Sequence, residues 1–383
     1  MNKKLIALAV AGATLVPMVA SAQSANPVTL YGRVFPMFES VKADGGTATP
    51  VPTRNRVSDN GPSFVGVRGT EDVGGGLKAF FQVEFGVRLD DNVTTTAVPV
   101  ATPPPGTLNN TPITGRNSGV GLQGDFGSIL LGRWDTPMKT ASIKIDPWVD
   151  TTIGGQQGTM GDRGNFNRRE NNVVEYWTPN MSGFEGRVSY AANEGRTATV
   201  NPSSTSFSAT YNQGPFYVAY TYENHKDQYK SYTSGLTFVA GGSERAQGIV
   251  GQVIFGNFKL GAMAQKYKKA NPANGIASQN TEARAQSFAA TYTANKNQFI
   301  YTYNTSKDST FATVGAAALP AEAVCKTNTA GYQYLFSKRT TFVALYAIVK
   351  NNATGLCNFG ANTLGIAADQ DPRGFAVGVK HLF

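Results

Sequence analysis

Apolar and polar residues alternate over short stretches of this chain, with the period of two that is typical of a β-strand. In the segment 77–85 every odd position is apolar, whereas Lys78, Gln82 and Glu84 occupy even positions. The last nine residues, 375–383, repeat the pattern, with His381 as the one polar member of an otherwise apolar set that ends on an aromatic residue. We therefore expect one face of each strand to contact an apolar phase and the other face to contact water.

Connections of two very different lengths separate these segments. Seven short ones have the Gly, Asn, Asp and Pro composition of tight turns, and they lie at 71–76, 124–127, 179–183, 212–215, 255–257, 294–297 and 337–340. Between them lie longer polar connections, such as those over 90–115, 135–168, 225–244, 307–326 and 351–371. Residues 229–239 have a strand-like pattern, but we assign them to the fifth long loop.

Seven tight turns imply eight hairpin loops and sixteen strands. The predicted strands span 28–40, 61–71, 76–88, 116–124, 127–134, 169–178, 183–193, 204–212, 215–225, 245–254, 258–269, 282–293, 298–307, 327–336, 341–350 and 372–383. Many are near the ~10 residues that a tilted membrane-spanning strand needs. The predicted fold is all-β: a 16-stranded antiparallel transmembrane β-barrel with short periplasmic turns and long external loops. A soluble β-sandwich, the alternative, would have polar residues on its outer face.

The beginning of the chain has the pattern of a secretory signal peptide. A basic start at residues 3–4 precedes an apolar run over 5–16, and residues 20–22 read Ala-Ser-Ala, a small-residue cleavage pattern. The run is too short for a spanning helix, and Gly12 and Pro17 interrupt it. Since no later segment has the ~20 apolar residues of a spanning helix, a membrane-integral chain must be a closed barrel. The predicted organisation is a signal peptide over 1–22 and a barrel domain over 23–383.

Composition narrows the class of protein further. Charged residues make up 15% of the chain, below the ~25% of soluble domains, whereas its 16 Tyr and 22 Phe argue against disorder. The net charge of +9 is compatible with nucleic acid, but the basic residues are scattered and no binding motif is present, so we expect no nucleic-acid partner. The only two histidines, His225 and His381, lie in no nucleophile motif. We therefore expect no enzyme, and no cofactor or metal motif is recognisable.

The two cysteines, Cys325 and Cys357, both lie in segments predicted to be loops. Export makes a disulfide between them chemically feasible, and two unpaired thiols are the alternative. Exposed thiols outside the cytoplasm are a liability, which favours the disulfide.

Several segments resemble those of the general diffusion porins of Gram-negative bacteria, in their β-proteobacterial branch. They are residues 28–32, 66–79, 124–137, 169–176 and 377–383, and they extend over essentially the whole predicted barrel domain. The resemblance implies a water-filled barrel that assembles as a homotrimer in outer-membrane lipid and lipopolysaccharide. It also implies that the third loop folds into the lumen as a constriction, and that the barrel-assembly machinery reads the terminal Phe383.

The longest connection between neighbouring strands, 135–168, is where that constriction loop belongs, and a loop of this length usually has a function. It carries the acidic candidates Asp146, Asp150 and Asp162. By motif position, the facing basic wall consists of Arg33, Arg68, Arg133 and Arg169.

Two positions complicate this wall. Simple alternation points Arg133 outward with Ile129 and Leu131, unless a strand-end bulge re-aims it. Phe64 stands where many relatives have an arginine, so the basic wall is either thinner here or supplied by Arg54 or Arg56.

We expect passive diffusion of small hydrophilic solutes and ions. Four wall arginines against three loop aspartates predict a preference for anions. A substrate-specific outer-membrane channel is the alternative, and a surface protein for adhesion or evasion is a further one.

Overall fold

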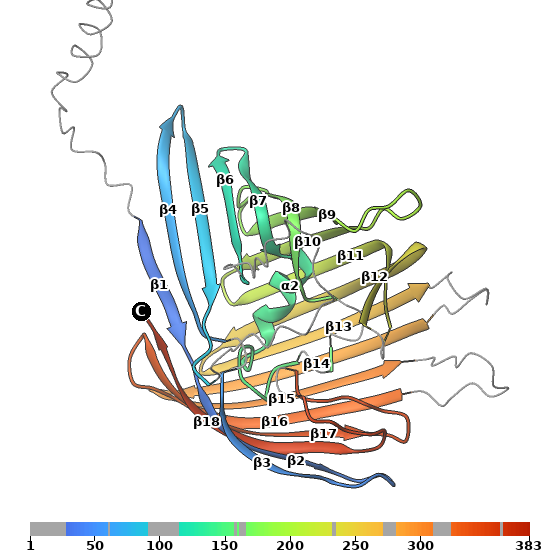
Figure 1. Ribbon diagram of the computed structural model, residues 1–383. Coiled ribbons are helices and arrows are strands. Elements are labelled where there is room, and N and C mark those ends of the chain that lie inside the picture. The colour runs from blue at the N-terminus through green and yellow to red at the C-terminus, as the bar shows by residue number, and fades with distance from the viewer. Residues whose placement is uncertain are drawn as a thin grey trace, which may run out of the picture.

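A computed structural model describes residues 28–59, 62–90, 115–156, 159–160, 166–231, 235–270, 281–308, 323–360 and 363–383. The predicted signal peptide, residues 1–22, lies outside them. The described strands form one antiparallel sheet that closes on itself as a barrel (Figure 1). Among the described residues, no helix has the length and apolar composition that a membrane-spanning helix needs.

The sheet contains 18 hydrogen-bonded segments. They are β1 (Thr29–Val34), β2 (Met37–Asp44), β3 (Val51–Ser58), β4 (Phe64–Gly74), β5 (Leu77–Gly86), β6 (Ser118–Gly124), β7 (Gly127–Asp135), β8 (Arg169–Trp177), β9 (Phe184–Ala192), β10 (Ser203–Gln213), β11 (Phe216–Ser231), β12 (Gly235–Phe255), β13 (Phe258–Ala270), β14 (Thr281–Ala294), β15 (Asn297–Asp308), β16 (Ala323–Leu335), β17 (Thr340–Asn351) and β18 (Asp371–Leu382). The seven predicted tight turns each join two consecutive paired strands.

These 18 segments form 16 strands of the barrel, as predicted. Each of the first two strands is interrupted once and therefore counts as two segments. The first strand comprises β1 and β2, with a break at Phe35 and Pro36, where proline cannot donate a ladder hydrogen bond. The second comprises β3 and β4. The predicted start of this second strand at residue 61 was wrong, because β3 begins at Val51. Its sequence contains Pro52, Arg54 and Arg56 and lacks an apolar alternation, so the pattern gives no signal for this part of the strand.

The assignment of residues 229–239 to a loop was also wrong. β11 and β12 continue as a paired hairpin to Ser231 and Gly235, with Tyr229 opposite Thr237. A register shift between Lys226 and Gln228 precedes this extension. The hydrogen-bonded hairpin therefore extends well beyond the ~10 residues that a spanning strand needs, and spanning length was the wrong criterion for its end.

The two ends of the described chain meet in the sheet. β18 pairs with β2 and also with β1, where Arg33 lies opposite Leu382. Gly32 and Phe383 exchange two backbone hydrogen bonds, with N···O distances of 3.0 and 3.2 Å. The Phe383 ring lies over Gly32 so closely that a Cβ there would be 2.4 Å from it. The absence of a side chain at Gly32 therefore lets the last residue close the barrel.

The two faces of the sheet differ in chemistry, as the alternation predicts. Large apolar side chains remain exposed on the outer face, among them Val120 (56%), Leu131 (53%) and Val174 (48%). The neighbouring inward residues Leu130 and Val173 are buried. An outer face of this kind suits lipid, and it excludes the soluble sandwich.

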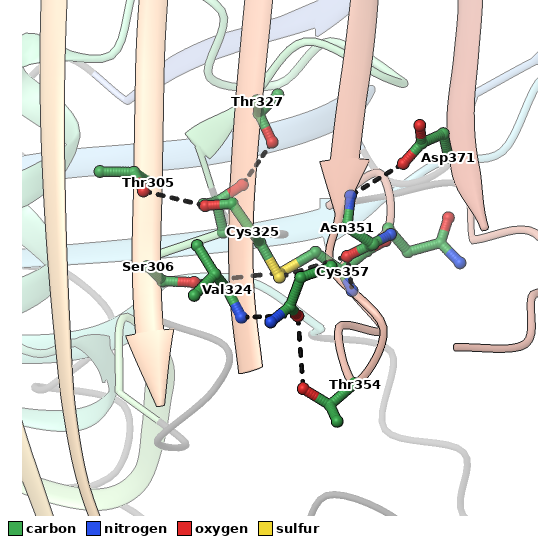
Figure 2. The surroundings of a disulfide bond; sticks show 12 residues. Thr305, Ser306, Val324, Cys325, Thr327, Asn351, Thr354, Cys357 and Asp371 are labelled. Atoms are coloured by element: carbon green, nitrogen blue, oxygen red, sulfur yellow. Dashed lines mark hydrogen bonds between the residues drawn. A yellow bond between two sulfur atoms is a disulfide. The ribbon is translucent and has the colours of Figure 1, made fainter. Parts of the chain in front are cut away.

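A disulfide joins Cys325 and Cys357, with their Cα atoms 5.9 Å apart (Figure 2). Cys325 lies in β16 and not in a loop, which corrects the prediction for that residue. The bridge ties the connection between β17 and β18, residues 352–370 (called loop 8), to the barrel wall. Asn351 supports it by accepting from the Cys357 amide at 2.8 Å and donating to the Cys357 carbonyl at 2.9 Å.

Candidate functional site

The third long connection spans residues 136–168 (called loop 3), and its described residues, 136–156, 159–160 and 166–168, lie inside the barrel. It begins with a short helix, α2 (Pro137–Ser142), followed by a 3-10 turn, η1 (Ile143–Ile145). Thr136 caps the helix by accepting from the Lys139 amide at 3.3 Å, and Pro137 fits the first helical position. Figure 1 shows α2 within the ring of strands, and it contacts β9, β10 and β11.

Apolar side chains hold loop 3 against two parts of the wall. Met138, Ala141 and Ile145 belong to a buried cluster with residues of β11 to β14. Further along, Trp148 and Ile153 belong to a second buried cluster with residues of β2, β16 and β17. Gly331 allows this approach, because a Cβ there would lie 2.6 Å from the Trp148 ring. Loop 3 therefore packs against the inner face of the barrel at two places.

Asp146 shapes loop 3 from within. Its side chain is 7% exposed, and its two carboxylate oxygens accept from the Trp148 amide at 3.0 Å and the Gln156 amide at 2.9 Å. Burial raises the pKa of Asp146 to about 6, against the opposing effect of those amide hydrogen bonds. The carboxylate thus serves the conformation of the loop.

Asp150 connects loop 3 to the wall. Its carboxylate lies 2.6 Å from a guanidinium nitrogen of Arg33 in β1. The residue adopts a positive φ of 73°, an uncommon conformation for a residue with a side chain. Arg33 also donates through Nε to the Pro62 carbonyl at 2.7 Å, so the guanidinium is fixed between wall and loop. The third predicted acid, Asp162, lies outside the described residues.

Arginines and aromatic rings interleave on the wall beside Arg33. The Arg33 and Arg116 guanidinium carbons lie 5.3 and 4.6 Å from the centre of the Phe64 ring. Next to Phe64, the Tyr31 ring carries the Arg68 guanidinium carbon at 4.7 Å. Phe64 therefore does not leave a gap, because cation–π contacts hold two guanidinium groups against it.

A single carboxylate from β5 joins this array. Glu84 accepts from the Tyr31 hydroxyl at 3.0 Å and forms an ion pair with Arg116 at 3.5 Å. Lys380 of β18 lies nearby, within electrostatic reach of Arg33 and Asp150. Arg33 and Arg68 of the predicted basic wall thus lie with Arg116 and Lys380, and from here on the basic wall means these four residues.

The other predicted arginines have different partners. Arg169 forms an ion pair with Asp135 at 3.1 Å, and Lys139 of α2 reaches the same carboxylate at 2.7 Å. Arg133 lies at a register shift between Gly132 and Trp134, and its guanidinium donates to Asn171. Among the described residues, no hydrogen bond, ion pair or ring contact joins Arg133 to Arg33 or Arg68.

Sequence reasoning missed four basic residues of the lumen or assigned them no definite role. Lys380 has the opposite parity to the apolar set of the last strand, so alternation alone points it inward. Arg116 precedes β6 in a connection, where alternation gives no direction. Arg54 and Arg56 of β3 both pair with the fully buried Glu39, at 3.6 and 2.8 Å, so they face the lumen.

These features define a closed, sixteen-stranded transmembrane barrel with an inward-folded loop beside a basic wall. Comparison with known proteins agrees with this class. The model of the Gram-negative porin family matches residues 7–354, and the chain therefore belongs to that family. It is a β-barrel porin of the Gram-negative outer membrane, a family of channels and not of enzymes.

Two curated relatives illustrate the range of similarity. Outer membrane porin protein 32 of Delftia acidovorans is 28% identical, over the full length of both chains. Major outer membrane protein P.IB of Neisseria gonorrhoeae is 31% identical over 57% of this chain. The chain spans a little over half of that relative's length, 56%.

Solved structures share the fold. An anion-selective porin from Comamonas acidovorans superimposes with a TM-score of 0.74 at 24% identity, covering 93% of this chain and 99% of that one. OmpT of Vibrio cholerae gives a TM-score of 0.61 at 15% identity, covering 93% and 97%.

Proposed function

We propose that this porin is a passive, anion-preferring channel for small hydrophilic solutes and ions. Loop 3 and the basic wall form its constriction, and a solute passes between them. Arg33, Arg68, Arg133 and Arg169 contribute positive charge, together with Arg116 and Lys380. Asp150 and Asp162 supply the acidic side, and Asp146 maintains the shape of the loop.

The observation that carries this proposal is the surplus of basic side chains where loop 3 meets the wall. Asp150 reaches Arg33 at 2.6 Å, which brings the loop to the wall. Arg33 pairs with Asp150 and Arg116 pairs with Glu84, and Arg68 and Lys380 add two further cations beside them. Fixed positive charge in a narrow, low-dielectric opening attracts anions and repels cations.

Assembly belongs to the same proposal. We propose a homotrimer embedded in outer-membrane lipid and lipopolysaccharide, delivered by a signal peptide over residues 1–22. The exposed apolar side chains of the outer face support contact with lipid and with neighbouring subunits. The position of Phe383 at the closing seam supports its role as the residue that the barrel-assembly machinery reads.

The experiment is single-channel recording of the purified protein in a planar bilayer under a KCl gradient. The expected result is a large conductance that appears in three equal steps. The sign of the reversal potential should show that chloride is more permeant than potassium. A reversal potential set by potassium would overturn the anion preference. A small conductance that saturates with one solute would indicate the alternative, a substrate-specific channel.

A further inference from the structure

A second group of ionisable side chains lies on the lumen wall where loop 3 returns to the barrel. His225 of β11 is fully buried between its cross-strand partners Ser204 and Glu244. Phe166, near the end of loop 3, stacks on the His225 ring with 4.6 Å between the ring centres. Glu170, at the start of β8, approaches from the side of loop 3. We call Glu170, Glu223, His225 and Glu244 the His225 cluster.

Both ring nitrogens of His225 face carboxylates. Nδ1 lies 3.1 Å from Glu244, and Nε2 lies 2.9 Å from Glu223. A neutral imidazole has one N–H and one lone pair, so it can donate to only one of these two groups. The other nitrogen would then direct its lone pair at a carboxylate oxygen. A cation is therefore needed at the ring, and it is either a second proton or a metal ion.

Two further observations favour a metal ion. Glu223 is fully buried, and its second carboxylate oxygen has no hydrogen-bond partner among the described residues. A proton on Nε2 would satisfy only the oxygen that faces the ring. One ligand atom each from Glu170, Glu223 and His225 lie within 4.8 Å of one another. In a tetrahedral zinc site, ligands at ~2.1 Å from the metal are about 3.4 Å apart, so small side-chain shifts would bring these atoms into place.

We propose that Glu170, Glu223 and His225 bind a divalent cation of the zinc class, with Glu244 as the group that orients the histidine. Imidazole nitrogen together with carboxylate oxygen suits Zn²⁺ and its first-row neighbours, whereas Ca²⁺ and Mg²⁺ prefer oxygen ligands alone. A carboxylate that accepts from the distal N–H of a ligating histidine is a frequent partner in zinc sites, and Glu244 occupies that position.

The surroundings fix Glu170 and leave it within reach of solvent. Arg168 pairs with its carboxylate, and the Ser204 hydroxyl donates to it at 3.0 Å. Glu170, Ser204 and Gln228 line an open cavity together with Arg168 and Arg169, so the Glu170 side of the cluster adjoins solvent. Because Glu170 begins β8 directly after loop 3, a bound metal would tie the end of that loop to β11.

The test uses the folded, full-length barrel after treatment with a chelator. Co²⁺ is titrated while its visible absorption is followed, and Zn²⁺ then competes for the same site. We expect one Co²⁺ per chain in the wild type. Binding should weaken by at least about 10–100-fold in H225Q, E223Q and E170Q. The matched control is H381Q, which removes the other histidine and should bind as the wild type does.

X-ray absorption of the zinc-loaded wild type gives a readout that needs no cluster variant to fold. One imidazole nitrogen and carboxylate oxygens around zinc, unchanged in H381Q, support the site. The proposal is overturned if the wild type binds neither metal at micromolar concentration. It is also overturned if the cluster variants bind as tightly as the wild type, or if zinc lacks an imidazole ligand.

Discussion

At the scale of the residue, Phe64 shows how a basic wall forms without an arginine at every expected position. The Phe64 ring carries the guanidinium groups of Arg33 and Arg116, and Tyr31 does the same for Arg68. Each such contact contributes about 0.5–2 kcal/mol. The aromatic rings therefore separate like charges and hold them in place, which keeps positive charge concentrated beside loop 3.

Arg116 offers a direct test of this arrangement, because it adjoins Phe64 and Glu84 and was not predicted from the sequence. A unit charge at ~4 Å from a passing ion contributes about 1 kcal/mol in water. We expect R116Q to lower the ratio of anion to cation permeability by up to roughly fivefold, measured as a reversal potential under a KCl gradient. R284Q is the matched control, since Arg284 is largely exposed and pairs with Glu282. An unchanged reversal potential in R116Q would remove Arg116 from the constriction.

Asp146 makes the docking of loop 3 depend on pH. Burial raises its pKa from 3.8 to about 6, so the folded state binds a proton that the unfolded state has released. The resulting contribution to stability is fully present below pH ~4 and is lost as pH rises through about 6; its full size is ~3 kcal/mol.

The measurement is the protection of the Trp148 and Gln156 amides from hydrogen exchange in the wild type, divided by their protection in D146N at the same pH. We expect this ratio to be larger at pH 5 than at pH 8. Comparison at equal pH removes the intrinsic pH dependence of exchange. Equal protection ratios at both pH values would contradict this assignment.

At the scale of the element, loop 8 is held by the disulfide and by burial. Phe359 and Leu364 of this loop are buried, in the same cluster as Trp148 of loop 3. The bridge joins residues 32 positions apart. Closing a loop of this length contributes roughly 3–4 kcal/mol in the chain-entropy model.

The double variant C325S/C357S should accordingly unfold at lower denaturant concentration, with a free energy of unfolding reduced by roughly 3–4 kcal/mol. Denaturant unfolding in detergent, followed by tryptophan fluorescence, measures the change. A reducing agent should shift the wild type to the same midpoint and leave the double variant unaffected. A midpoint unaffected by both treatments would show that the hydrogen bonds of Asn351 suffice to hold loop 8.

Alternation and turn chemistry were enough to predict most elements, because each spanning strand has a lipid face that must be apolar. The same reasoning failed for the parts of strands that extend beyond the lipid-facing band. β3 lies in a polar segment, and the extension of the β11–β12 hairpin exceeds the spanning length. Loop 3 could be located by its length, but the positions of Asp146 and Asp150 depend on loop hydrogen bonds that have no sequence period. The His225 cluster was not predicted, because alternation along the chain does not show that Glu170 of β8 lies beside Glu223 and His225 of β11.

At the scale of the whole molecule, the barrel closes where Phe383 meets Gly32. A Cβ at residue 32 would lie 2.4 Å from the Phe383 ring and 2.6 Å from the Phe64 carbonyl oxygen, distances that real Cβ atoms do not show. G32V should therefore reduce the fraction of folded barrel, measured by the mobility shift between unheated and heated samples in gel electrophoresis. G86V is the matched control, because a Cβ at Gly86 would meet nothing within 4 Å. Equal folded fractions for the two variants would show that the seam accommodates the added side chain.

The closing seam also carries the residue that anchors loop 3. Arg33 lies opposite Leu382, one residue from the end of the chain, and the same Arg33 binds Asp150. The register of the last strand therefore helps to fix the position of this guanidinium beside loop 3. In the proposed channel, closure of the barrel and selection among ions would then depend on the same few atoms.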